Sequence, residues 1–140
     1  MLAPMDEKLT LLRGVPLFAD LDERSLEAIG VLMHEVDLPA GHVLMQEGET
    51  GDTFYVIVDG TLRVERTGGT ARSMTAGGFL GEIALLERGT RTATATCVSD
   101  SRLLELRKHE FDRLMQTFPH ILRRIQAAVA RRPRGGAEGS

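Results

Sequence analysis

The spacing of apolar residues changes twice along the chain and divides it into three parts. In the first part these residues recur at helical spacing, which predicts helices over residues 6–12 and 23–33. Asp22 is suited to cap the second helix at its N-terminus. In the middle part, residues 35–106, the period shortens to two, as in β-strands. In the last part the helical spacing returns.

The middle part contains seven candidate strands, separated by turns in which glycine is frequent. Their ranges are 35–38, 42–46, 53–58, 62–66, 71–75, 92–98 and 102–106. Asp59-Gly60 stands between two of them and predicts a two-residue hairpin that would pair Ile57 with Leu62. Many short strands with frequent turns are typical of a β-sandwich or a β-barrel.

The last part predicts two further helices, over residues 110–117 and 120–132. The second helix has an apolar stripe on one face, formed by Ile121, Leu122, Ile125, Ala128 and Val129. Its other face carries three arginines, interpreted as a solvated surface: Arg123, Arg124 and Arg131. Proline and glycines beyond the helix predict a disordered tail at 134–140, so the domain is expected to span residues 1–133.

Composition limits the classes of protein that fit. A chain of 140 residues has room for about one domain. The net charge of −3 argues against nonspecific binding of nucleic acid over the whole surface. No apolar stretch approaches the roughly 20 residues that span a bilayer, and the N-terminal residues lack a signal-peptide core. We therefore expect a cytoplasmic protein that binds neither membrane nor nucleic acid. Cys97 is the single cysteine, which rules out an internal disulfide.

The candidate chemistry lies between Gly77 and Ala95. Glycines lead into a short apolar run, and the start of a helix presents free N–H groups to an anion. Arg91, nine residues after Glu82, has a fork of donors that matches a phosphate. A carboxylate beside a phosphate needs a partner of its own, and a sugar hydroxyl could donate to it. These residues favour a nucleotide site; the alternative is a turn and a buried helical turn, with Arg91 as a surface charge.

Other kinds of site find less support. The four histidines do not form the cluster that a jelly-roll metalloenzyme would need: His34, His42, His109 and His120. No Gly-x-Ser-x-Gly motif is present, and Cys97 falls within a predicted strand. We therefore expect no catalytic residue, no bound metal and no cofactor, and we interpret the chain as a binding protein rather than an enzyme.

Two motifs at a characteristic spacing identify a resemblance to a known family. Phe79-Leu80-Gly81-Glu82-Ile83-Ala84-Leu85-Leu86, followed by Arg91-Thr92-Ala93-Thr94, resembles the phosphate-binding cassette of cyclic-nucleotide-binding domains. These domains occur in the catabolite activator protein, in kinase regulatory subunits and in cyclic-nucleotide-gated channels. The resemblance implies an α+β fold: an antiparallel, jelly-roll-like β-roll of eight strands with N-terminal helices and C-terminal lid helices.

The resemblance also implies roles for individual residues. Glu82 would accept a hydrogen bond from the ribose 2′-hydroxyl, and Arg91 would pair with the cyclic phosphate. Backbone contacts would come from the neighbouring residues Leu80, Gly81, Ile83 and Ala84. Thr92 would touch the phosphate or a guanine amino group. Val64, Met74 and Leu80 would form an apolar wall around the base and the ribose. Arg132 would lie near the base as part of a C-terminal lid.

The implied function is reversible binding of a cyclic nucleotide, with cAMP favoured over cGMP. The chain would act as a regulatory module through movement of its C-terminal helices, and a protein effector could read that movement in trans. The sequence leaves open the effector, the oligomeric state and whether this is a separate protein or part of a longer one. The alternative is a β-roll that mediates interaction or dimerisation and binds no nucleotide.

Overall fold

The computed structural model of the chain describes residues 5–82 and 90–131. Three helical segments come first: α1 (Met5–Arg13), η1 (Pro16–Phe18) and α2 (Glu23–Leu32). The strands follow as β1 (His34–Leu38), β2 (Val43–Met45), β3 (Thr53–Asp59), β4 (Thr61–Glu65), β5 (Arg72–Thr75), β6 (Phe79–Leu80), β7 (Thr94–Cys97) and β8 (Ser101–Arg107). The described part ends with α4 (Lys108–Thr117) and α5 (Pro119–Ala130). The four helices expected at 6–12, 23–33, 110–117 and 120–132 are represented by α1, α2, α4 and α5, whereas the short helical turn expected at 83–86 lies outside the described residues. Strand β6 is a short strand that the sequence pattern did not predict.

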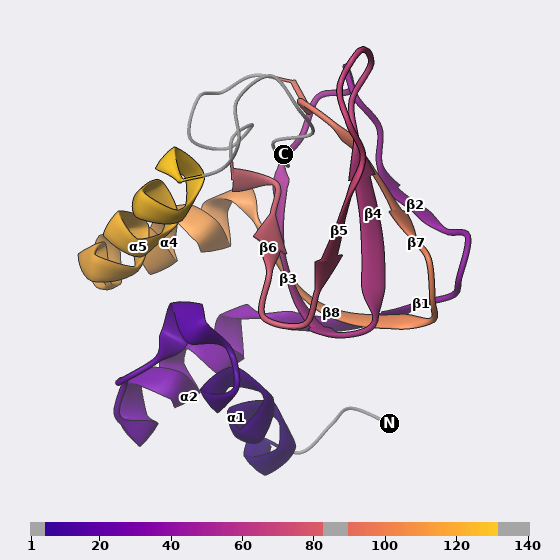
Figure 1. Ribbon diagram of the computed structural model, residues 1–140. Coiled ribbons are helices and arrows are strands. Elements are labelled where there is room, and N and C mark those ends of the chain that lie inside the picture. Colours follow the sequence, from indigo (N-terminus) through magenta and orange to yellow (C-terminus); the bar gives the residue numbers. More distant parts are fainter. Residues whose placement is uncertain (1–4, 83–89, 132–140) are drawn as a thin grey trace.

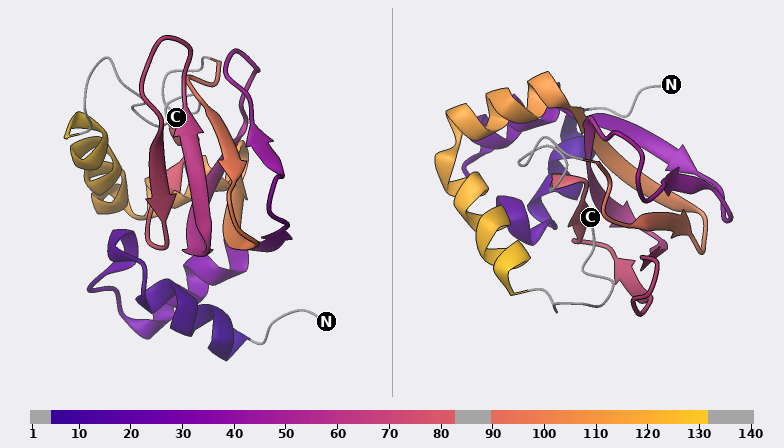
Figure 2. Two further views of the ribbon diagram at one scale, coloured as in Figure 1. Left: turned by 45° about the vertical axis from the view of Figure 1, so that its right-hand side comes forward. Right: turned by 90° about the horizontal axis from the view of Figure 1, so that it is seen from above.

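The strands form two four-stranded antiparallel sheets that face each other as a β-roll. One sheet has the order β1-β8-β3-β6 and the other β2-β7-β4-β5. Both pairs of helices lie on the side of the roll formed by the first sheet, with α1 and α2 below α4 and α5 in the view of Figure 1. The view from above in Figure 2 shows the helices along one side of the roll. The expected α+β architecture is therefore confirmed.

Strand β3 is buried on both faces and separates two hydrophobic clusters. Phe54 and Val56, which are fully buried, belong to the cluster between the first sheet and the helices. Ile57 belongs to the second cluster, which fills the inside of the roll. The buried members of this interior cluster are Met45, Ile57, Leu62, Val64, Met74, Leu80, Ala93, Ala95, Cys97 and Leu103.

The predicted hairpin at Asp59-Gly60 is wrong. Strand β3 pairs with β6 and β8, whereas β4 pairs with β5 and β7, so β3 and β4 belong to different sheets. Gly60 has φ +102°, and a Cβ there would meet the backbone and side chain of Ser101. The chain uses this glycine to cross from one sheet to the other. Ile57 and Leu62 both face the interior cluster, as expected, but across the roll rather than as neighbours in a sheet.

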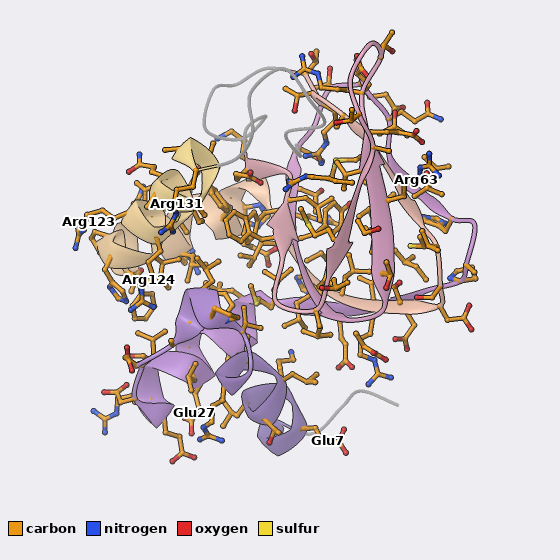
Figure 3. The ribbon with its side chains drawn as sticks, in the orientation of Figure 1. Glu7, Glu27, Arg63, Arg123, Arg124 and Arg131 are labelled. Carbon is orange, nitrogen blue, oxygen red and sulfur yellow. The ribbon has the colours of Figure 1, made fainter. Side chains whose placement is uncertain are left out.

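The apolar stripe of α5 is covered by the rest of the domain. Ile121 and Ile125 are fully buried in the cluster beneath the first sheet, and α5 contacts both α4 and η1. Arg124 corrects one expectation, because it does not lie on a solvated face. Its Nη1 donates to the carbonyl oxygens of Leu17 and Ala19, each at 2.9 Å. Figure 3 shows Arg124 on the side of α5 nearest the N-terminal helices, whereas Arg123 points away.

No helix in the described ranges is long and apolar enough to cross a membrane. The expected tail at 134–140 lies outside the described residues, as do the ends of the proposed domain, 1–133.

Candidate functional site

Strand β6 carries the chain to the first half of the candidate site. It ends at Leu80, and Gly81 then adopts φ +96°, a left-handed conformation that favours glycine. The turn places Glu82 inside the molecule, where the residue has 0% of its surface exposed. Acidic residues are rarely buried to this extent without a specific partner, so Glu82 is a buried charge that its surroundings must stabilise.

Arg91 forms the second half of the site and is also buried, with 6% exposed. Its guanidinium donates from Nη1 to the carbonyl oxygen of Gly81 at 3.2 Å and from Nη2 to that of Thr53 at 2.9 Å. These bonds hold the planar group between the β6 turn and the start of β3. The alternative interpretation of Arg91 as a surface charge is therefore wrong.

Two glycines make room for the guanidinium. A Cβ added at Gly51 would fall on the Nε, Cζ and Cδ atoms of Arg91. A Cβ added at Gly81 would meet the carbonyl oxygen of Thr53 and would lie 2.9 Å from Nη1 of Arg91. Only residues without a side chain allow the backbone to approach this closely. Neither Gly51 nor Thr53 was predicted from the sequence as a site residue.

The backbone on either side of Arg91 is fixed by the same turn. The amide of Arg91 donates to the carbonyl oxygen of Glu49 at 2.7 Å, and the amide of Gly48 donates to that of Arg91 at 2.9 Å. Thr50 and Thr90 form an isolated antiparallel bridge beside these bonds. Arg91 is therefore held at its main chain and at its side chain, which preorganises it for binding.

The charges of the site act on one another. Burial lowers the pKa of Arg91 from its ordinary value, while the negative charges of Asp52, Glu82 and Glu49 oppose that change. Burial also raises the pKa of Tyr55, whose ring lies at the edge of the interior cluster. Because a guanidinium remains protonated in proteins, the site offers a buried cation with a carboxylate close by. A ligand that carries both an anionic group and a hydroxyl matches this pair.

Apolar side chains line the roll beside these charged groups. The residues expected as an apolar wall, Val64, Met74 and Leu80, all belong to the interior cluster. Ala93 and Ala95 lie in the same cluster on the approach to β7 and in the strand itself. Small side chains at these two positions leave the inner surface less filled than valine or leucine would.

The other expected site residues divide into two groups. Thr92 directly follows Arg91, lies outside β7 and is half-buried. Ile83, Ala84 and Arg132 lie outside the described residues, so their expected ligand contacts stay predictions. Among the described residues, no group of three or more His, Cys, Asp and Glu side chains could hold a metal ion.

A surface depression of about 410 Å³ lies elsewhere on the roll. It is lined by Asp37, Leu38, Pro39, Asp59, Asp100, Ser101 and Arg102. Asp59 ends β3, whereas Thr53, which binds Arg91, begins it, so the depression lies at the far end of that strand. Within it Arg102 donates to Asp37 at 2.8 Å. The buried charges and close-packed glycines at Arg91 describe a more specific site than this open acidic surface.

Comparison with known proteins identifies relatives of this chain. A cGMP-dependent protein kinase, egl-4 of Caenorhabditis briggsae, is 39% identical over 84 residues, which cover 60% of this chain and 11% of the kinase. The Cyclic AMP receptor protein of Thermus thermophilus is 30% identical over 128 residues, or 88% of this chain and 59% of that protein. The chain thus spans 59% or less of the length of these curated relatives.

A solved structure and a family model also match this chain. The structure described as Sp-2Cl-cAMPS bound to PKAR CBD2 superimposes with a TM-score of 0.75 at 26% identity. The match covers 87% of this chain and 86% of the other. A family model described as the cyclic nucleotide-binding domain matches residues 35–118, which include Glu82, Arg91 and the whole of the β-roll after the first residue of β1. The chain belongs to the cyclic nucleotide-binding domain family.

Proposed function

We propose that this domain binds a cyclic nucleotide reversibly, with the cyclic phosphate at Arg91 and the ribose 2′-hydroxyl at Glu82. The observation that carries the proposal is the burial of both charged residues side by side at the Gly81 turn. A guanidinium has five N–H donors, so its bonds to Gly81 and Thr53 leave it able to bind a phosphate as well. The carboxylate of Glu82 is an acceptor for a hydroxyl group.

The domain acts as a regulatory module and has no catalytic role in this proposal. Its family is regulatory, and relatives such as the cAMP-dependent protein kinase regulatory subunit of Schizosaccharomyces pombe work within larger signalling proteins. Ligand binding would shift the equilibrium between two positions of α4 and α5 only by as much as the affinity for the ligand differs between them. An effector in the same chain or in trans would read that shift. We place the domain in the cytoplasm.

The contacts of α5 define one of these two positions. In the described conformation α5 lies against η1, with Ile121 and Ile125 of its stripe fully buried and Leu122, Ala128 and Val129 partly buried. A second position would have to break the bonds from Arg124 to Leu17 and Ala19. Arg132, just beyond α5, would reach the base in the ligand-bound position.

Calorimetry with cAMP, cGMP and 5′-AMP tests the proposal. We expect saturable binding of at least one cyclic nucleotide with a stoichiometry of one, and weaker or undetectable binding of 5′-AMP. The open phosphate of 5′-AMP leaves a 3′-hydroxyl and carries more negative charge beside the buried Glu82. If neither cyclic nucleotide binds, the domain is an interaction module on the same fold. The preference for cAMP over cGMP depends on the family resemblance alone.

A further inference from the structure

We propose that this domain pairs with a second copy of itself through its helices, with α2 of each copy lying against α5 of the other. The inference concerns the outer surface of the helices and is independent of the proposed nucleotide site, to which none of the residues involved belongs. The second copy is the partner because the helical side of the molecule is complementary in charge to itself.

The N-terminal and C-terminal helices carry opposite charge. Residues 5–33 contain six acidic and three basic residues, whereas residues 108–131 contain two acidic and five basic residues. Helix α5 itself contains no acidic residue. Both helix pairs lie on the same side of the roll, with α1 and α2 below α4 and α5 in Figure 1. The helical side of the molecule therefore has an acidic half and a basic half.

Outward-facing charges on α2 and α5 form no ion pair with any side chain in the described ranges. They are Glu23 and Glu27 on α2, Arg123 on α5 and Arg131 at the C-terminal cap of α5, and all are exposed. The ion pairs of the described residues join other side chains. Figure 3 shows Glu27 and Arg123 on the helices, away from the roll. Both surfaces are therefore able to receive a charged partner.

The exposed residues of the two helices recur at the same spacing. Residues four apart lie on one face of a helix, so each set forms a stripe. The stripe on α2 consists of Glu23, Glu27 and Val31, and the stripe on α5 consists of Arg123, Ala127 and Arg131. Val31 is 70% exposed, and the small side chain of Ala127 leaves room for a second helix to approach α5.

Placing Val31 of one copy against Ala127 of the other brings opposite charges together. Glu27 precedes Val31 by one turn, so it lies opposite Arg123 if the two helices run parallel and opposite Arg131 if they run antiparallel. In either orientation the other arginine reaches past the C-terminal end of α2, where the helix dipole favours a cation. The match of charges therefore does not depend on the direction of the helices.

A two-fold axis forms this contact twice. Helix α5 contacts η1, which precedes α2, so the basic and acidic stripes belong to neighbouring parts of one surface. A copy that places its α5 on α2 then presents its own α2 to α5, which is the arrangement of an isologous dimer. Because the stripes are mostly charged, electrostatic attraction contributes more to this interface than apolar burial does. We therefore expect a weak dimer that is sensitive to salt.

Sedimentation velocity of the full chain tests for this dimer. We expect the wild type at about 0.1 mM to be largely dimeric in about 0.02 M salt and to dissociate in about 0.5 M salt, where exposed charges are largely screened. At about 1 µM it should be monomeric at either salt concentration. A chain that remains monomeric at the higher concentration in low salt, or a dimer that salt does not affect, overturns the inference.

Charge reversal tests whether α2 and α5 form the interface. Glu27→Arg makes both stripes basic, and the double variant Arg123→Glu/Arg131→Glu makes both acidic. Each protein alone should dimerise at least about tenfold more weakly than the wild type, because every reversed pair occurs twice. An equimolar mixture should recover the affinity of the wild type, since each α2 then meets an α5 of opposite charge.

Arg63→Glu is the matched control, because it reverses one exposed charge on the roll and should leave the dimer unchanged. Circular dichroism checks that each variant is folded. If a reversed variant does not fold, Glu27→Gln and Arg123→Gln replace it, and each should weaken the dimer about threefold. A folded variant that dimerises like the wild type, or a mixture of the two reversed proteins that stays monomeric, would show that α2 and α5 do not form the interface.

Discussion

Arg91 owes its position to contacts that lie far apart in the sequence. Its guanidinium is held by the carbonyl oxygens of Thr53 and Gly81, and Gly51 leaves the space it occupies. A phosphate bound there would gain a charged donor that is already fixed in place. The cost of ordering a long side chain is therefore met on folding rather than on binding.

Arg91→Leu should weaken cyclic-nucleotide binding by at least about tenfold, because hydrogen bonds to charged groups are worth roughly 1.5–3 kcal/mol each. Calorimetry measures the affinity, and thermal unfolding checks that the variant is folded. Arg63→Leu is the matched control, since Arg63 is an exposed arginine on the outer face of the roll. Unchanged affinity in a folded Arg91→Leu variant would remove Arg91 from the site.

Glu82→Gln should weaken binding and reduce discrimination against the 2′-deoxy ligand. The amide keeps the shape of the carboxylate but is a weaker acceptor for the ribose hydroxyl. The measurement is the ratio of affinities for a cyclic nucleotide and its 2′-deoxy analogue, in the wild type and in the variant. Equal ratios in the two proteins would show that Glu82 does not accept the 2′-hydroxyl.

At the scale of elements, the C-terminal helix is attached to the N-terminal segment rather than lying free over the roll. Arg124 joins α5 to the backbone of η1, and Ile121 and Ile125 anchor the same helix in the core. An element that moves on ligand binding must exchange such contacts for others of similar free energy. The hydrogen bonds from Arg124 to Leu17 and Ala19 are the polar contacts that such a movement would have to replace.

Arg124→Ala should loosen α5, because the carbonyl groups of Leu17 and Ala19 lose their charged donor. Hydrogen exchange of the amides of residues 120–130 in the ligand-free protein should become faster, by about tenfold or more for a loss of ~1.4 kcal/mol in local opening free energy. Arg123→Ala is the control, because Arg123 is an exposed neighbour on the same helix. Identical exchange in the two variants would mean that the Arg124 bonds do not hold the helix.

At the scale of the whole molecule, two acidic residues, Asp22 and Glu110, accept hydrogen bonds at the N-terminal ends of α2 and α4. Asp22 accepts from the amide of Ser25 at 2.8 Å, and hydrogen bonds from Ser25 lower its pKa. Burial alone would raise the pKa of Glu110, but hydrogen bonds from the Arg107 amide and from His34 outweigh it and lower the pKa. His34 belongs to β1 and Glu110 to α4, so this hydrogen bond also joins the roll to the C-terminal helices.

Acid should therefore destabilise the fold partly through these two residues. A carboxyl group whose pKa is lowered on folding adds stability above its unfolded pKa and loses that contribution as the pH falls through its folded pKa. For Asp and Glu this window begins at about pH 5 and extends downward. The variant Asp22→Asn/Glu110→Gln should show a smaller difference in urea unfolding free energy between pH 7 and pH 4 than the wild type. An unchanged difference would assign the acid sensitivity to other carboxyl groups.

The sequence alone determined most of the elements and indicated the candidate site at Glu82 and Arg91. Hydrophobic period is a local property that reports which face of each element is buried, so the helices, most strands and the inward direction of Ile57 and Leu62 could be predicted. Glu82 and Arg91 could be predicted because their spacing along the chain is itself the signal. The tertiary structure decided what period cannot encode: β3 and β4 lie in different sheets, and Arg124 binds η1 rather than water. It also placed Gly51 and Thr53 around Arg91. Each of these depends on contacts between residues distant in sequence, which burial and hydrogen bonding select only when the whole chain packs.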